Sequence, residues 1–151
     1  MKPFQLGSWV SGLIVGLLVM TATAQAATYY VATMGSDANP GTLAAPFRTV
    51  QHGINQLQPG DTLLLQDGIY GPATIDCSAN ARNGTAAAPI TLKAENERKA
   101  HLQGDGSAIV LYISGCSYWT FEGLYVTSAD RPPEYDYNNV RVYQSDHLIF
   151  R

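Results

Sequence analysis

The stretch Leu57–Tyr70, LQPGDTLLLQDGIY, decides the fold. Its Pro-Gly-Asp ends the preceding segment, because proline and glycine interrupt regular elements. Three leucines then form a short apolar strand, and an Asp-Gly pair turns the chain again. In such a strand Leu63 and Leu65 point to one side and Leu64 to the other. Turns that follow so closely on short strands favour a series of small β-coils stacked on one another.

The segment before this stretch, Pro46–Leu57, has the one convincing helical pattern after residue 26. Its apolar residues fall on a single helical face, and proline suits the first turn of a helix. These residues are Phe47, Val50, Ile54 and Leu57. We expect a helix of about three turns over the open edge of the first coil, because an uncovered strand edge invites aggregation. Leu64 is expected to lie beneath this helix.

The remaining chain reads as short strands bounded by Gly, Asp, Asn and Ser. They are Thr28–Ala32, Thr62–Gln66, Ala73–Asp76, Ile90–Ala94, Ala108–Ser114, Tyr118–Phe121, Leu124–Thr127, Val140–Tyr143 and His147–Phe150. Three segments, Ile90–Gly104, Val110–Gly123 and Val140–Arg151, share two apolar residues at i and i+2, a polar bend and a closing apolar strand. Their offsets of 20 and 30 residues predict an all-β solenoid of about three to four coils, with two strands in each repeat.

The first 26 residues have the features of an export signal. Lys2 supplies the positive start, Trp9–Met20 is an apolar run too short to span a bilayer comfortably, and the segment ends at Ala26 in a small-x-small pattern. The alternative is an uncleaved membrane anchor. We expect residues 27–151 to form a single domain outside the cytoplasm, secreted or periplasmic, with no membrane span after cleavage.

The net charge makes nucleic acid an unexpected partner. Residues 27–151 hold eight basic and twelve acidic side chains, a net charge of −4 without a basic stripe, which argues against nucleic-acid binding. We expect a monomer.

An oxidising compartment permits a disulfide between Cys77 and Cys116. The alternative is that both are small buried residues stacked on neighbouring coils.

Three stretches carry a resemblance to a known family. They are TYYVATMGSDANPGTLAAPFRTVQ from Thr28, QPGDTLLLQDGIY from Gln58, and APITLKAENERKAHLQGDG from Ala88. They resemble the N-terminal region of secreted right-handed parallel β-helix proteins of the pectate-lyase-like superfamily. The resemblance implies a right-handed parallel β-helix with an N-terminal amphipathic capping helix. It also implies a lyase acting on acidic, uronate-containing polysaccharides, with calcium as a cofactor.

In that superfamily the catalytic lysine or arginine and the calcium-binding aspartates generally lie on later coils. No stretch of this chain matches those positions, so no catalytic residue is carried over. The sequence also ends within a strand pattern. We therefore expect a truncated gene product or N-terminal fragment that is inactive alone.

The segment Ser128–Asn139, SADRPPEYDYNN, holds the candidate site residues. A uronate lyase needs a cation to neutralise the substrate carboxylate and a base to abstract the C5 proton. Carboxylate oxygens suit calcium, which makes Asp130, Glu134 and Asp136 the candidate metal ligands. Arg131, Tyr135 and Tyr137 are the candidate substrate contacts. The alternative is a solvated loop stiffened by its prolines, with the tyrosines packed on an adjacent coil.

His101 and His147 occupy similar places in the proposed repeat, and we expect outward-facing, stacked positions in preference to a catalytic pair.

Two other functions are compatible with the sequence. The first is a non-enzymatic extracellular β-helix adhesin or glycan-binding module. The second is a decayed fragment with no activity.

Overall fold

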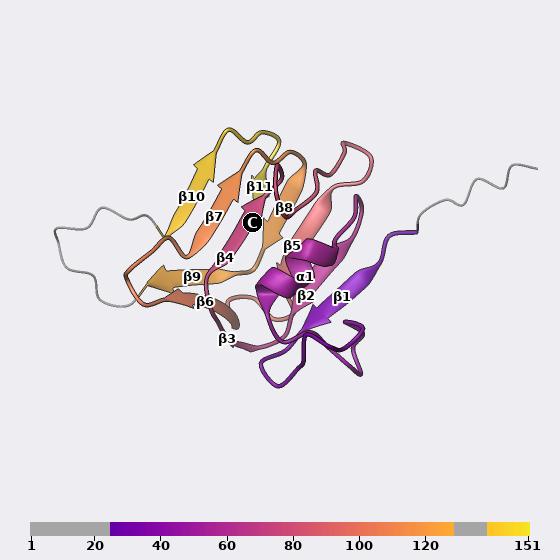
Figure 1. The fold of residues 1–151 in the computed structure, drawn as a ribbon, viewed down its shortest axis with the longest axis vertical. Coiled ribbons are helices and arrows are strands. Elements are labelled where there is room, and N and C mark those ends of the chain that lie inside the picture. Colours follow the sequence, from indigo (N-terminus) through magenta and orange to yellow (C-terminus); the bar gives the residue numbers. More distant parts are fainter. Residues whose placement is uncertain (1–24, 129–138) are drawn as a thin grey trace, which may run out of the picture.

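The computed structural model describes residues 25–128 and 139–151. The described elements are β1 (Thr28–Val31), α1 (Val50–Gln56), β2 (Thr62–Leu65), β3 (Gly68–Tyr70), β4 (Ala73–Asp76), β5 (Ile90–Ala94), β6 (Ala100–Gly104), β7 (Leu111–Ser114), β8 (Trp119–Glu122), β9 (Tyr125–Ser128), β10 (Val140–Tyr143) and β11 (Ile149–Phe150). The strands form three sheets, in the orders β1-β2-β5-β8-β11, β10-β7-β4 and β3-β6-β9 (Figure 1).

Every ladder between the described strands is parallel. Each coil contributes one strand to each of the three sheets. The first coil contains β2, β3 and β4, the second β5, β6 and β7, and the third β8, β9 and β10. Strand β11 then returns to the first sheet. This arrangement is a parallel β-helix of three full coils in the described residues, so the predicted solenoid is confirmed.

The coils repeat every 29 residues in the largest sheet. Thr62 pairs with Thr91, Thr91 with Thr120, and Thr120 with Ile149. Two details of the predicted repeat are therefore wrong, because each coil has three strands and β5 stacks on β8, not on β7. Of the three aligned segments, the second and third do share a sheet through β7 and β10. The alternation of apolar residues is similar in all three sheets, so the pattern alone did not distinguish them.

Inward side chains from successive coils pack on one another to form the core. Leu63 and Leu65 are fully buried, as predicted, and Leu63 stacks through the ladder on Leu92 and then Phe121. Burying one such side chain stabilises a fold by roughly 1.5–3 kcal/mol. No single coil could bury these residues alone, so each coil depends on its neighbours for its core.

Helix α1 begins at Val50 and has two turns, so the predicted start at Pro46 is wrong. Phe47 bridges to Val31 in β1, and the Asp37 carboxylate accepts hydrogen bonds of 2.9 Å from the backbone N of both Arg48 and Thr49. These tertiary contacts hold Arg48 and Thr49 out of the helix, and the Thr49 hydroxyl caps its first turn. The predicted apolar face is confirmed, because all four of its residues are buried.

Helix α1 covers the N-terminal end of the coils, where it contacts β1, β2 and β4 (Figure 1). A Cβ atom added at Gly53 would lie 2.6 Å from Cδ1 of Leu63, so a larger residue here would force the Leu63 side chain or the helix to move. Leu63 therefore lies under the helix, and the prediction for Leu64, which is half-buried on the outer side of β2, is wrong. The predicted role of the helix as a cap is confirmed.

The predicted signal segment lies almost entirely outside the described residues. Within residues 25–128 and 139–151, no helix has the length and apolar character needed to cross a membrane.

Candidate functional site

The outer face of the β10-β7-β4 sheet carries one straight row of polar and aromatic side chains. The register places Thr74 beside Tyr112 and Tyr112 beside Arg141. Thr74 and Arg141 are exposed and Tyr112 is half-buried. Since neighbouring strands are about 4.8 Å apart, the row extends for roughly 10 Å along the axis of the coils. Along this axis the row presents a hydroxyl group, then an aromatic ring and then a guanidinium group.

Arg141 differs from the cations on the neighbouring face of the coil. Lys93 and Arg151 both lie 3.2 Å from the carboxylate of Glu122, so their charges are partly neutralised. The Arg141 side chain makes no ion pair or hydrogen bond with any residue in the described part of the chain. A planar guanidinium can bind a carboxylate through two parallel hydrogen bonds.

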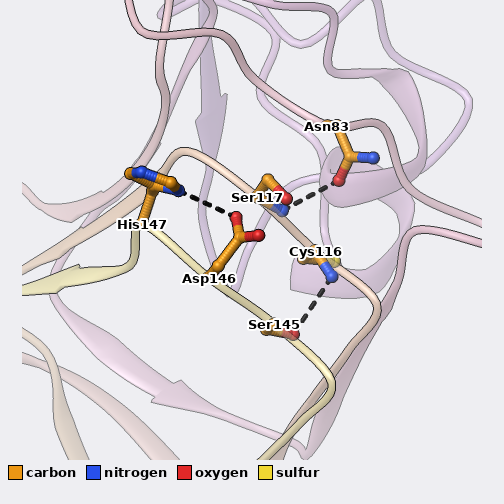
Figure 2. Close-up of polar contacts among 6 residues, drawn as sticks. All are labelled: Asn83, Cys116, Ser117, Ser145, Asp146 and His147. Atoms are coloured by element: carbon orange, nitrogen blue, oxygen red, sulfur yellow. Dashed lines mark hydrogen bonds and ion pairs between the residues drawn. The ribbon is translucent and has the colours of Figure 1, made fainter.

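The turns that follow β7 and β10 form a second polar cluster (Figure 2). They stack in the same 29-residue register as the strands, with Ser117 bridged to Asp146. The backbone N of Cys116 donates to the Ser145 hydroxyl at 3.0 Å. The backbone N of Ser117 donates to Asn83 Oδ1 at 2.9 Å. These bonds join three successive coils at one corner of the solenoid.

The side chains of Ser117, Asp146 and His147 lie together in this cluster but do not form a catalytic triad. Hydrogen bonds from the Ser117 side chain and then from His147 hold the pKa of Asp146 below its ordinary value. His147 Nδ1 is 3.0 Å from the Asp146 carboxylate. The aspartate thus lies between serine and histidine, whereas a triad needs the histidine in the middle to take the serine proton. The arrangement stabilises the turn and does not activate Ser117.

A disulfide joins Cys77 and Cys116, whose Cα atoms are 5.1 Å apart. It links the end of β4 to the turn after β7 and closes a loop of 39 residues in sequence. Cys116 is fully buried. The two cysteines are bonded across neighbouring coils, and Cys77 is only half-buried, unlike the buried pair of the alternative.

The six residues predicted to bind metal or substrate lie outside the described residues. They are Asp130, Arg131, Glu134, Tyr135, Asp136 and Tyr137. Their segment leads in sequence directly into β10, which carries Arg141. In the part of the chain that the structure describes, no group of three His, Cys, Asp or Glu side chains is placed to hold a metal ion. The calcium site stays a prediction.

The two histidines do not occupy equivalent places, so that part of the prediction is wrong, but the expected outward-facing, stacked positions are confirmed, because each ring stacks on a tyrosine of a neighbouring coil. His101 lies in β6, with its ring 4.5 Å from Tyr125 and its Nε2 atom 2.5 Å from the Thr127 hydroxyl. His147 lies in the turn before β11, with its ring 4.4 Å from Tyr118. The error follows from the misassigned repeat. Tyr112 and Arg141 were not predicted, although their 29-residue separation marks them as equivalent positions on neighbouring coils.

The three stacked parallel sheets define the class of this molecule, a parallel β-helix protein. Residues 29–150 match the family described as "Pel9A-like, right handed beta helix region". The chain belongs to this family, and the predicted pectate-lyase-like resemblance is confirmed.

Named relatives are much longer than this chain. Pectate lyase PEL9 of Emericella nidulans is 30% identical over 115 residues, which cover 66% of this chain and 27% of that protein. The solved structure of pectate lyase Pel9A has a TM-score of 0.53 and 24% identity, covering 66% of this chain and 28% of the other. The GH136 lacto-N-biosidase of Eubacterium ramulus has a TM-score of 0.53 and 25% identity, covering 65% and 20%. The chain thus spans about a quarter or less of the length of each.

Proposed function

We propose that this chain forms the N-terminal part of an exported β-helix protein that acts on polysaccharides, and that the whole protein is a lyase of uronate-containing glycans. The observation that carries the proposal is the match of residues 29–150 to the Pel9A-like family. The relative PEL9, a pectate lyase, supports the acidic substrate. The guanidinium of Arg141, which has no ion-pair partner among the described residues, also supports it, since such a group suits a carboxylate.

A uronate lyase neutralises the substrate carboxylate, removes the proton at C5 and expels the sugar oxygen at C4. In this chain Arg141 would bind the carboxylate, Tyr112 would contact the sugar ring, and Thr74 would hydrogen-bond a hydroxyl group. These three residues bind and orient the polymer along the coils. We assign these three residues to binding and assign no proton transfer to Arg141, because an arginine is permanently charged.

The base and the cation of the reaction would come from elsewhere in the protein. The described residues do not fit a calcium site, so no step is assigned to calcium here. Asp130, Glu134 and Asp136 stay the candidate ligands by their chemistry and by their position in sequence just before β10. We therefore propose that residues 27–151 bind the glycan and are catalytically incomplete alone.

Product analysis tests this proposal. The complete product of the reading frame and residues 27–151 would each be mixed with polygalacturonate, alginate and chondroitin, with and without calcium. We expect the complete product to release 4,5-unsaturated uronate, detected by its ultraviolet absorbance, and residues 27–151 to bind a polymer without cleaving it. New reducing ends without the unsaturated product would indicate a hydrolase instead. Binding without cleavage by the complete product would indicate the non-enzymatic glycan-binding module.

A further inference from the structure

A cavity of about 520 Å³ opens at the helix-capped end of the solenoid. Three segments meet around it: the loop after β1, the start of α1 and the turn between β3 and β4. Its lining residues are Thr33, Arg48, Thr49, Val50, Gln51, Ile69, Tyr70, Gly71 and Pro72. The volume is in the range of small-ligand sites, which is roughly 300–1,000 Å³.

The cavity borders the start of the polar row on the β10-β7-β4 sheet. Gln51 lines the cavity, and its side-chain amide bonds to the backbone of Thr74, the first member of the row. Gly71 and Pro72 also line it and lead directly into β4. A polymer lying along Arg141, Tyr112 and Thr74 therefore runs toward this cavity.

The lining combines one positive charge with hydroxyl groups and apolar surface. The Arg48 side chain is exposed and has no ion pair among the described residues. Ile69 has 64% of its surface exposed, which is unusual for an isoleucine on a sheet face. Asp37 binds the backbone N of Arg48, but its carboxylate is not part of the lining.

Tyr70 contributes a ring to the wall and keeps its hydroxyl proton. The hydroxyl lies 2.8 Å from the carbonyl oxygen of Gln66 and 3.2 Å from that of Val31, inside the coil. Burial, with smaller contributions from the charges of Asp67 and Glu95, raises the pKa of Tyr70 to about 12. Tyr70 therefore adds no negative charge to the cavity at neutral pH.

We propose that this cavity is a terminal subsite that binds one uronate residue of the glycan, with the Arg48 guanidinium holding its carboxylate. Thr33 faces the hydroxyl groups of the sugar, and Ile69 contacts its C–H face, whereas the Thr49 hydroxyl is already bonded to Asp37 and to the backbone N of His52. The proposal rests on the proposed function, since the ligand is the glycan that the polar row binds. It adds a second carboxylate contact, at the opposite end of the row from Arg141.

The chain offers two variants that test the cavity in independent ways. Arg48→Gln removes the charge and leaves the backbone bond to Asp37 in place. Gly71→Leu adds a bulky side chain at the cavity lining, and it should be tolerated because a Cβ atom at Gly71 meets nothing within 4 Å and the backbone there is not left-handed. Arg82→Gln is the matched control, since Arg82 is also exposed and does not line the cavity.

Calorimetric titration of residues 27–151 with galacturonate oligomers of increasing length provides the test. We expect both cavity variants to lower the affinity for the longer oligomers by about tenfold or more, and Arg82→Gln to leave it unchanged. Thermal unfolding of each variant checks that it folds, and the NMR signals of Ile69 in the unaltered chain should shift on titration whatever the variants do.

The outcomes separate the two proposals. If the unaltered chain binds the oligomers but the cavity variants and the Ile69 signals do not respond, the subsite is wrong and the proposed function stands. If the unaltered chain binds no uronate oligomer, both proposals fail.

Discussion

The side-chain amide of Gln51 pairs with the backbone of Thr74 as a neighbouring strand would. Nε2 of Gln51 donates to the carbonyl oxygen of Thr74 at 2.9 Å, and the backbone N of Thr74 donates to Oε1 at 2.8 Å. Strand β4 is the first strand of its sheet, so this edge has no strand on its N-terminal side. One glutamine on α1 thus satisfies the backbone groups that an open edge would expose.

Gln51→Leu should lower the free energy of unfolding by about 1–2 kcal/mol, because two hydrogen bonds to the backbone are lost. It should also increase aggregation, since the edge of β4 becomes available to other chains. Urea denaturation and light scattering measure the two effects. Gln56→Leu on the same helix is the control, because Gln56 is exposed. Equal stability of the two variants would show that the pairing with Thr74 contributes nothing.

Removing the disulfide between Cys77 and Cys116 should destabilise the chain substantially. The bond closes a loop of 39 residues, and by restricting the unfolded chain it should stabilise the fold by about 4 kcal/mol. Changing both cysteines to alanine should lower the free energy of unfolding by this amount in urea denaturation. A reductant should lower the midpoint of the unaltered chain and leave the variant unaffected. A midpoint that does not respond to reductant in either protein would contradict this.

The stability that Asp37 gives to the start of helix α1 should depend on pH. Burial alone would raise the pKa of Asp37, but the hydrogen bonds from Thr49 and from the backbone N of Arg48 outweigh it and lower the pKa below the ordinary value of 3.8. A lowered pKa in the folded state means that the carboxylate stabilises the fold above about pH 3.8. This contribution is lost as the pH falls through the folded value.

Asp37→Asn should therefore cost up to about 1 kcal/mol at pH 7, an upper figure because solvent screens this partly exposed carboxylate, and the cost should shrink as the pH falls below 3.8. Denaturation at a series of pH values measures the difference from the unaltered chain. Glu97→Gln, at an exposed turn, makes the same change in charge away from the helix and serves as the control. A difference that stays constant down to pH 2 would exclude the carboxylate as its source.

The polar row should contribute to glycan affinity through Arg141 and Tyr112. Arg141→Gln should weaken binding of galacturonate oligomers by about tenfold or more, because a charge-assisted hydrogen-bond pair is lost. Tyr112→Ala should weaken the binding of neutral and acidic oligomers alike, because the aromatic ring contacts the sugar and not its carboxylate. Arg82→Gln should again have no effect. If Arg141→Gln binds the oligomers as tightly as the unaltered chain, the row is not part of the binding site.

Local chemistry in the sequence determines some of this architecture. The Pro-Gly-Asp stop and the alternation of Leu63 and Leu65 predicted the first coil, because burial of one strand face is a period-two property. The predicted start of α1 was wrong because Asp37, eleven residues before Arg48, binds the backbone N of Arg48 and holds this part of the chain out of the helix. Tertiary hydrogen bonds of this kind override helix propensity and leave no local signal.

The register of the coils was harder to predict. Strand β3 has three residues and cannot be told from a turn by its composition. The long turn after β4 in the first coil puts Ala73 and Leu111 38 residues apart, whereas Leu111 and Val140 are 29 apart. The candidate sites depend on this register, because the row forms only when equivalent positions stack. The cavity likewise joins three segments that are distant in sequence.

The stacking of equivalent positions carries all of these conclusions, and NMR of residues 27–151 tests it most directly. Through-space contacts between backbone protons should connect β2 to β5 around Leu63 and Leu92, and β5 to β8 around Leu92 and Phe121. The pattern should be that of parallel strands with a 29-residue offset. Antiparallel contacts between consecutive segments, such as β2 with β3, would contradict the β-helix and the glycan-binding face with it.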